Sequence, residues 1–350
     1  MSHEIDMSNN KANIAYVGEK PWHGLGAEMV DGMSIEQWRE AAGLNWEVKG
    51  SPVMYMNGEL RKWDERKVLY RSDTGAPLSV MGDGFNVVQP ADILNLYGEI
   101  AKAAGFKLET AGALSGGRRI WALARVGEGA DVVGKDRIRP YILLATAFDG
   151  TMATVAKFTA VRVVCHNTMS AAIPQYDPEA GRMSGGGEYD EKAPGRQQVV
   201  RILHSTKWDE KIAARVRMDL GIVHNSFERF MVETRALAAR PMADKEADDF
   251  VAMLLEPYVS GGKDGKKRDV RETKGYKRIL ELFRDKSIGH EMAGRTRWGM
   301  LNAVTQMIDH ERGRSDATRL ESAWFGTGNA IKERAFRILE GEFSRVEEVA

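Results

Sequence analysis

The chain has 350 residues, of which 43% are hydrophobic and 29% are charged, and its 50 basic side chains balance its 50 acidic ones. These fractions are typical of a soluble globular protein with one large domain or two ordinary ones. A single cysteine excludes a disulfide framework and a cysteine-based zinc site. The polar start lacks the apolar stretch of a signal peptide, and no run of 18 apolar residues follows. We therefore expect a cytoplasmic protein without a membrane partner.

The neutral total hides an uneven distribution of charge along the chain. Residues 1–60 carry 4 basic and 9 acidic side chains, whereas residues 261–300 carry 12 basic and 6 acidic ones. This asymmetry favours an anion bound by the middle of the chain, or head-to-tail contacts between subunits. Mixed charges that merely solvate helix faces would give the same pattern.

The first predicted elements are an N-terminal arm with a first helix over residues 1–48, and then strands. A strand from Val53 enters an Asn57–Gly58 turn, the strongest short hairpin signal, and Lys67–Arg71 continues after it. A second strand segment, broken by glycines, covers Ser79–Val88.

A helix and two further hairpins complete the predicted antiparallel sheet of residues 49–173. Pro90 opens the helix, which runs over Ala91–Ala104, because proline is tolerated in a first helical turn. Phe106–Val126 reads as one hairpin, and Tyr141–Val164 as the longest one. The order β-β-β-α-β-β-β-β predicts an α+β fold, an antiparallel sheet with a packed helix.

The apolar period becomes helical beyond a segment rich in glycine and proline. Residues 174–195 have little apolar content, so we expect a linker or loop that is dispensable for folding. Residues 196–350 form a mainly helical region, which starts at Val199 and includes a helix that Asp244 caps and that ends at Leu255. The other predicted helices are Thr273–Arg284, Trp298–His310 and Ala330–Phe343.

Motifs for catalysis and metal binding are incomplete. Gly112–Arg119 has the glycine spacing of a phosphate loop, but Arg118 and Arg119 replace its lysine and its Ser/Thr. We interpret this segment as a hairpin turn between two strands. Cys165 and His166 are adjacent, whereas a nucleophile and its base are usually distant in sequence, so a small buried cysteine is favoured. We predict no catalytic residue, no metal and no cofactor.

Three short motifs are not explained by composition. Pro21–Gly26 holds an aromatic pair between turn residues, and it would serve as an anchor in a core or as a platform that stacks on a base. Arg162 lies on an apolar strand, so its charge needs an anionic partner. Arg295 and Arg297 stand with Trp298 at the start of a helix, where positive charge opposes the helix dipole. A phosphate or a carboxylate is expected beside them.

Together these motifs resemble one family. Pro-Trp-His-Gly-Leu-Gly, then Arg-Val-Val-Cys-His-Asn-Thr, and then Trp298 to His310 followed by Phe325-Gly326 are similar to the phage- and plasmid-related "domain of unknown function 932". The resemblance covers about Pro21 to Phe336. It implies a protein of mobile elements in a bacterial host cell, with no catalytic residues to transfer. By architecture alone, the chain is also similar to single-strand annealing proteins of the RecT and Red-beta type.

We therefore expect a nucleic-acid-binding protein of phage or plasmid replication or recombination. It would bind and anneal single-stranded DNA without ATP, through phosphate contacts and base stacking, and form homo-oligomeric rings or filaments. Two alternatives are a nucleotide- or nucleic-acid-processing enzyme and a structural or host-interaction protein without catalysis. The candidate nucleic-acid-binding residues are Arg118, Arg119, Arg125, Lys157, Arg162, Arg295, Arg297 and Trp298.

These candidates are not equivalent. Arg118 and Arg119 lie beside the predicted Gly116–Gly117 turn, where we expect both to reach solvent. Lys157 and Arg162 are five residues apart on one strand, so they should face opposite sides. Trp298 either stacks on a base or belongs to the core.

Overall fold

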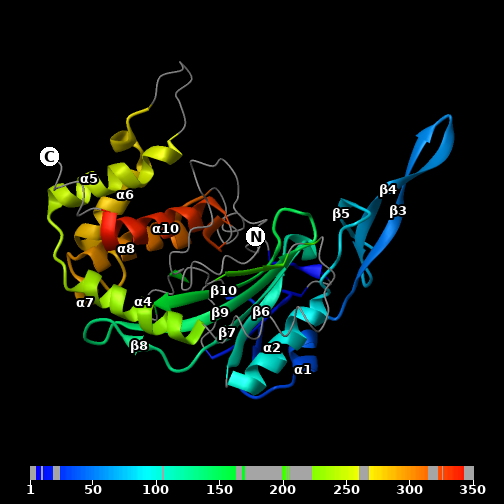
Figure 1. Ribbon diagram of the computed structural model, residues 1–350, viewed down its shortest axis with the longest axis horizontal. Coiled ribbons are helices and arrows are strands. Elements are labelled where there is room, and N and C mark those ends of the chain that lie inside the picture. The colour runs from blue at the N-terminus through cyan, green and yellow to red at the C-terminus, as the bar shows by residue number, and fades with distance from the viewer. Residues whose placement is uncertain are drawn as a thin grey trace, which may run out of the picture. The chain divides into compact units, whose positions relative to one another are not determined.

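The computed structural model divides the chain into two compact units (Figure 1). The first comprises Met1–Gly127, Tyr141–Phe158 and Gln197–His224, and the second comprises Glu128–Pro140, Thr159–Arg196 and Asn225–Ala350. The structure describes residues 5–8, 11–18, 24–104, 106–162, 168–169, 199–202, 204, 223–259, 268–313, 322–324 and 326–342. The predicted linker 174–195 and the motif residues Pro21, Trp22, His23, Cys165 and His166 lie outside them.

The fold is α+β, as the sequence predicts. The strands are β1 (Ile14–Val17), β2 (Ala27–Met29), β3 (Val48–Asn57), β4 (Glu59–Arg71), β5 (Pro77–Gly82), β6 (Lys107–Leu114), β7 (Arg119–Arg125), β8 (Ala130–Asp131), β9 (Arg137–Ala147), β10 (Thr154–Arg162), β11 (Thr168–Met169) and β12 (Val199–Ile202). The helices are α1 (Ile35–Ala41), α2 (Pro90–Ala104), α4 (Val223–Ala238), α5 (Asp244–Leu255), α6 (Lys274–Glu281), α7 (His290–Ala293), α8 (Arg297–Gln306) and α10 (Thr327–Arg337).

The larger sheet contains two of the predicted hairpins. Its strands follow the order β11-β10-β9-β7-β6-β1-β2, with β8 beside β9 and β12 beside β10. The hairpins predicted over Phe106–Val126 and Tyr141–Val164 are confirmed as β6–β7 and β9–β10. A 3-10 turn, Ser115–Gly117, joins β6 to β7, so the phosphate-loop-like segment is a hairpin turn.

Two short strands stand where the sequence predicts other structure. β1 lies in the predicted N-terminal arm, but it pairs with β6 and its Ile14 and Ala15 are buried. Val199–Ile202, predicted to begin a long helix, form β12 and pair with Thr154–Lys157. Three of these four residues are β-branched, and ladder pairing with β10 overrides the helical spacing of the apolar residues.

Helices α1 and α2 pack together against strands of this sheet (Figure 1). Ser34 and Gln37 form a capping box at the start of α1, in which each side chain accepts the other's backbone N–H, at 3.3 and 2.8 Å. Trp38 is the buried side chain of α1, and the predicted helix after Pro90 is confirmed as α2.

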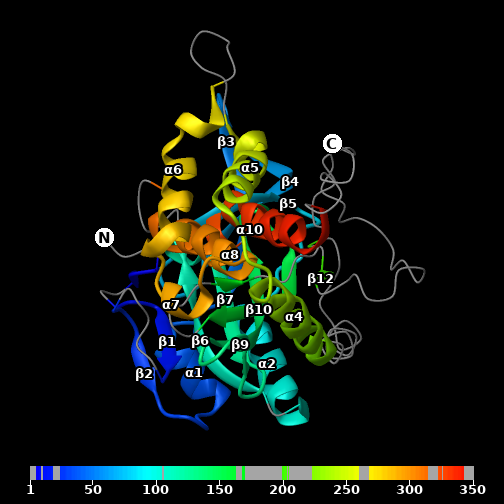
Figure 2. The same ribbon diagram turned by 90° about the vertical axis from the view of Figure 1, so that its left-hand side faces the viewer.

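Helix α8 is the central helix of the second unit (Figure 2). It contacts α6, α7 and α10, and each of its residues from Trp298 to Gln306 is buried. A helix buried on every side must satisfy its polar groups internally. Asn302 Nδ2 accordingly donates to the Trp298 carbonyl at 2.8 Å.

Two smaller findings concern the ends and the length of the helices. Asp244 was predicted to cap α5, but it is the first helical residue, and the cap is Ala243, which has no side-chain hydrogen bond. Within the described ranges, no helix is long and apolar enough to cross a membrane.

Candidate nucleic-acid interface

The β3–β4 hairpin carries the candidate interface. β3 and β4 have 10 and 13 residues, whereas their neighbour β5 has 6. The hairpin therefore extends beyond the end of β5 (Figure 1). The predicted Asn57–Gly58 turn is confirmed, because β3 ends at Asn57 and β4 begins at Glu59. We call the outer part, Val53–Trp63, the ribbon.

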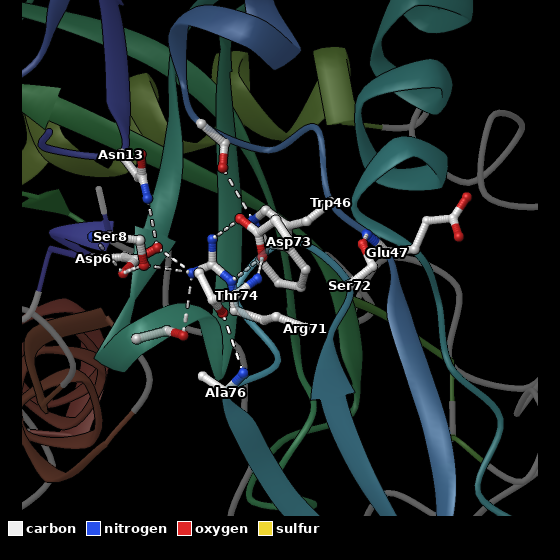
Figure 3. Close-up of polar contacts among 12 residues, drawn as sticks. Asp6, Ser8, Asn13, Trp46, Glu47, Arg71, Ser72, Asp73, Thr74 and Ala76 are labelled. Atoms are coloured by element: carbon white, nitrogen blue, oxygen red, sulfur yellow. Dashed lines mark hydrogen bonds and ion pairs between the residues drawn. The ribbon is translucent and has the colours of Figure 1, made fainter. Parts of the chain in front are cut away.

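Arg71 fixes the root of this hairpin. Figure 3 shows its guanidinium between the carboxylates of Asp6 and Asp73. Nε and Nη2 donate to Asp73 at 2.9 and 2.7 Å, and Nη1 donates to Asp6. The guanidinium also lies over the Trp46 ring, 4.4 Å from its centroid. Arg71, Asp6 and Trp46 are almost completely buried, so charge, hydrogen bonds and packing act together here.

The Arg71 cluster keeps its two carboxylates ionised. Burial alone would raise the pKa of Asp6, but hydrogen bonds from Ser8, Arg71 and Asn13 and the charge of Arg71 hold the pKa below its usual value. The hydrogen bond and charge of Arg71 likewise lower the pKa of Asp73, against a smaller effect of burial. A buried ion pair of this kind tolerates the loss of neither partner.

Gly117 allows the Arg71 cluster to pack closely. Its φ is 92°, and a Cβ there would lie 3.0 Å from Arg71 Nη1 and 3.1 Å from the Trp46 ring. Any larger residue would therefore be strained by its own backbone and would push into the cluster.

Two further side chains hold the base of β3 and β4. The Gln89 amide accepts from the Val48 N–H at 2.9 Å and donates to the Val48 carbonyl at 3.1 Å, as a neighbouring strand would. Lys67 Nζ donates to the carbonyls of Asp83 and Phe85, at 2.6 and 2.9 Å. These contacts hold the base of the hairpin in place, and none of them involves the ribbon.

A bulge separates the base from the ribbon. Pro52 pairs with Lys67, but the next residue, Val53, pairs with Trp63. Such a bulge increases the local twist and re-aims the side chains beyond it. Pro52 also lacks an N–H, which discourages the addition of another strand at this edge.

One face of the ribbon carries aromatic and basic side chains. Residues directly opposite in an antiparallel pair share a face, so Tyr55 and Arg61 lie on the same side as Trp63. Tyr55 and Trp63 are 46% and 45% exposed, which is unusual for such large side chains. The Arg66 guanidinium lies 5.4 Å from the centroid of the Trp63 ring. We call Tyr55, Arg61, Trp63 and Arg66 the aromatic face.

The arginines of the aromatic face are open to solvent. Arg61 and Arg66 are exposed, and neither forms an ion pair with a residue that the structure describes. Lys62, on the opposite face, is by contrast bound to Asp64 at 2.7 Å. The aromatic face therefore offers two uncompensated guanidinium groups beside two exposed rings.

The opposite face of the ribbon is apolar. Met54 pairs with Lys62, and Met56 pairs with Leu60. Met56 is 71% exposed and Leu60 63%. We call Met54, Met56 and Leu60 the methionine face. Exposed apolar side chains that gather in one patch commonly mark an interaction surface.

The predicted candidates of the larger sheet differ in exposure. Arg118 is exposed at the β6–β7 turn, but Arg119, also predicted to reach solvent, is buried and donates to Thr151 Oγ1 at 2.9 Å. Its place in the ladder opposite Ala147 accounts for this. Arg125 is partly buried and lies 3.7 Å from Glu109. The side chain of Lys157 lies outside the described part of the structure.

Arg162 and Trp298 belong to a buried polar cluster of the second unit. Arg162 Nε and Nη2 donate to the two oxygens of Asp136 at 2.6 and 2.7 Å, and Trp298 Nε1 donates to the same carboxylate at 2.8 Å. Arg162 also donates to the carbonyls of Ile288 and Gly289. The predicted anionic partner of Arg162 is therefore Asp136, and Trp298 is a core residue. Neither side chain presents surface to a nucleic acid in this structure.

Carboxylates also lie beside the two arginines at the start of α8. Arg295 is bound to Asp244 at 2.5 Å, and Arg297 to Glu246 at 2.9 Å. Both acidic residues come from the first turn of α5. The predicted choice between a phosphate and a carboxylate at this position is resolved in favour of carboxylates.

Among the predicted candidates, Arg119, Arg162 and Trp298 are thus buried, and Arg125, Arg295 and Arg297 lie beside carboxylates. The residues of the ribbon were missed by sequence reasoning, although their hairpin was predicted. A signal was present: large apolar residues occupy both alternating sets of positions over Val53–Trp63, with charges between them. In a strand that covers a core, one set would be polar. Among the described residues, no three His, Cys, Asp or Glu side chains are placed to hold a metal ion.

The structure is that of an α+β protein with an exposed β ribbon in the first unit and a mainly helical second unit. Residues 77–182 and 191–324 match the family described as a domain of unknown function (DUF932). Since these segments cover more than half of the chain, the protein belongs to this family. No curated protein and no solved structure matches it. The similarity to RecT-type annealing proteins therefore has no support.

The matched segments include the buried polar cluster but not the ribbon. Asp136, Arg162 and Trp298 lie within them, so the buried cluster joins two of the motifs on which the resemblance rests. The ribbon precedes residue 77 and lies outside the match. A function for the ribbon must therefore be argued from its own side chains.

Proposed function

We propose that the protein binds single-stranded nucleic acid, without ATP, through the aromatic face of the ribbon. The observation that carries this proposal is the exposure of Tyr55 and Trp63 beside the exposed guanidinium groups of Arg61 and Arg66. Aromatic rings stack on unpaired bases of any sequence, and arginines neutralise the backbone phosphates between them. Both interactions need exposed side chains that are not already bound to other residues.

The fixed base of the hairpin supports this proposal. A binding group that is held in place loses little conformational entropy when a ligand arrives. Arg71, Gln89 and Lys67 hold the strands from which the ribbon extends. In phage or plasmid replication or recombination, the setting that the family resemblance implies, such binding would protect single strands and assist their annealing.

Fluorescence anisotropy with short labelled oligonucleotides tests the proposal. Trp63→Ala should weaken binding by about 1–3 kcal/mol, the contribution of a stacked base. Met56→Ala, which removes an exposed side chain from the opposite face, is the matched control and should bind as the wild type does. If the wild-type protein binds no oligonucleotide, or if both variants bind equally well, the proposal is wrong.

The same experiment separates this function from an enzyme that processes nucleic acid. Each oligonucleotide is incubated with and without Mg²⁺ and then checked for cleavage products. Binding without cleavage in both conditions agrees with the proposal. Cleavage that depends on the protein would instead favour the enzymatic alternative.

The methionine face favours a second candidate function, self-association. We propose that this face packs against the same face of a second copy of the chain, since a two-fold interface buries identical patches against one another. The acidic first 60 residues and the basic residues 261–300 would add complementary charge between copies. Mass photometry is the test: Met56→Glu should shift an oligomer towards the monomer. A monomeric wild-type protein, with and without oligonucleotide, would exclude this function, and a host protein would then be the next candidate for this face.

A further inference from the structure

The His204 ring joins two segments of the first unit that are far apart in the sequence. β12 pairs with β10, and Ile202 lies opposite Thr154. Continued by two residues, this register places His204 opposite Met152. The Nε2 atom of the ring accordingly lies 3.1 Å from the Met152 carbonyl oxygen, in the turn that precedes β10. The Nδ1 atom lies 3.0 Å from the Asn86 carbonyl oxygen, between β5 and α2.

Two further contacts hold the His204 ring in this position. The backbone N–H of Asn86 donates to the His204 carbonyl at 2.6 Å. The Phe85 ring is stacked on the imidazole, with the ring centroids 4.2 Å apart and an angle of 20° between the planes. The half-buried imidazole is therefore in contact through one face and through both nitrogens, and it cannot turn away from one carbonyl without losing the other contacts.

This geometry fits a proton on each ring nitrogen. A carbonyl oxygen only accepts hydrogen bonds, whereas a neutral imidazole has one N–H and one lone pair. Whichever nitrogen of neutral His204 carries the proton, the other presents a lone pair to a carbonyl oxygen. The imidazolium form donates to both carbonyls, and the face of the Phe85 ring also attracts its positive charge. The contacts of His204 thus favour the cationic form.

The charged groups around His204 do not form ion pairs with it where the structure describes them. The charged residues on the segments nearest to the ring are Lys67, Asp83, Asp149, Lys157 and Arg201. The Asp149 carboxylate accepts from the Thr151 N–H at 3.1 Å, and the Asp83 side chain is exposed. The side chains of Lys157 and Arg201 lie outside the described residues. The two carbonyl oxygens are therefore the described polar partners of the ring.

The segment that His204 contacts also supports the base of the β3–β4 hairpin. Lys67 donates to the carbonyls of Asp83 and Phe85, directly before the carbonyl that His204 contacts. Lys67 lies opposite Pro52, where the bulge begins. The His204 ring therefore holds the same short segment, residues 83–86, that holds Lys67 beside the start of the ribbon.

We propose that His204 is a pH-sensitive latch at the base of the hairpin. The imidazolium donates to the Asn86 and Met152 carbonyls and ties residues 83–86 to the turn before β10. Histidine ordinarily changes its charge between about pH 5 and about pH 8. When one proton passes to water, a lone pair faces a carbonyl oxygen, one hydrogen bond is lost, and residues 83–86 are held less firmly. This latch does not depend on binding of nucleic acid by the ribbon.

NMR of the full-length protein with labelled histidine rings is the first test. The His204 signals are those absent from His204→Phe. At the acid end both N–H protons should be visible, because hydrogen bonds slow their exchange with water. As the pH rises, one should be lost, and the backbone amide signals of Phe85 and Asn86 should shift with the same midpoint. In His204→Phe these amide signals should not shift. A His204 ring with one N–H throughout, or a titration that leaves both amide signals unmoved, would overturn the proposal.

Urea denaturation is the second test, and it does not require His204→Phe to resemble the wild type. His204→Gln has an amide that donates to one carbonyl at every pH. Relative to this variant, the wild type should be most stable at low pH, because the second hydrogen bond exists only in the imidazolium form. Its unfolding equilibrium constant should rise about tenfold relative to that of His204→Gln as the pH increases, as expected for one hydrogen bond from a charged donor.

The two variants supply the matched control for this measurement. Neither glutamine nor phenylalanine at position 204 titrates, so the difference in stability between His204→Gln and His204→Phe should not change with pH. If the difference between the wild type and His204→Gln is equally constant, the proposal is wrong. Neither test contains nucleic acid, so failure of the latch and failure of the ribbon function are distinguishable.

Discussion

The base and the outer part of one hairpin place the same residue types in opposite environments. Arg71 and Trp46 at the base are buried, with carboxylates around the guanidinium. Arg66 and Trp63, further along β4, are exposed and free of carboxylate partners among the described residues. An arginine that stacks on a tryptophan is thus structural at one end of the strand and available to a ligand at the other.

This contrast shows that partner and burial, rather than residue type, decide what an arginine does. A buried guanidinium must be paired, because an unpaired buried charge costs several kcal/mol. An exposed one costs little to leave unpaired and keeps its donors for a ligand. The two ends of the hairpin should therefore respond differently to the same substitution.

The largest expected effect is at the base. Arg71→Met would leave the buried Asp6 carboxylate without its cation and should lower the free energy of unfolding by about 3–5 kcal/mol. Arg61→Met makes the same change in the ribbon and should leave the denaturation midpoint where it is. Urea denaturation measures both variants. If both variants lost a similar amount of unfolding free energy, Arg61 would be as important for the fold as Arg71, and the ribbon would not be an exposed, unpaired surface.

The next largest effect on stability is expected when a buried and an exposed tryptophan, Trp298 and Trp63, are each replaced by phenylalanine. Trp298→Phe removes the indole N–H that binds Asp136 and should cost about 1–3 kcal/mol, the penalty for a buried acceptor that loses a donor. Trp63→Phe keeps an exposed aromatic ring in the ribbon and should not change stability. Thermal unfolding of the two variants checks the prediction, and an unaltered midpoint in Trp298→Phe would contradict the buried hydrogen bond.

Acid should reduce the difference in free energy of unfolding between the wild type and Arg71→Met. The pKa values of Asp6 and Asp73 are below their usual value in the folded protein, so their ionised forms stabilise the fold above the unfolded pKa. That stabilisation is lost as the pH falls through the folded pKa values. In Arg71→Met, burial raises the pKa of Asp6, and protonation relieves the unpaired charge. Denaturation at several pH values below 5 measures this difference in free energy of unfolding. A difference that does not change with pH would contradict the effect of Arg71 on the pKa values of the two carboxylates.

The sequence predicted the elements whose signals are local. The Asn57–Gly58 turn, the glycines at the β6–β7 turn and Pro90 at the start of α2 each act over a few residues, and these elements are confirmed. β1 and β12 have only four residues each and depend on pairing with distant strands. Short apolar runs of this kind do not distinguish a strand from a helix.

The partners of the charged residues were less predictable. The position of Arg162 on an apolar strand indicates that it needs an anion. Its partner Asp136, however, lies between β8 and β9, and Trp298 lies on a helix far along the chain, so neither could be identified from local sequence. The ribbon was missed for another reason. A strand with large apolar residues on both sides looks like a buried strand in sequence, and only the end of β5 reveals that nothing in the described structure covers it.

The smallest effect on folding, and the sharpest test of the comparison, is expected for the exposed arginines. The double variant Arg61→Ala and Arg66→Ala should fold with wild-type stability but bind single strands more weakly. Each lost phosphate contact should reduce the slope of log affinity against log salt by about 0.7 for a single strand, whereas Trp63→Ala should leave this slope unchanged. Lys62→Ala removes a basic residue that is bound to Asp64 on the opposite face, so it is the matched control and should keep the wild-type slope. Anisotropy titrations at several salt concentrations measure all of these slopes. If Lys62→Ala reduces the slope as much as the double variant does, binding depends on the net charge of the hairpin rather than on its aromatic face.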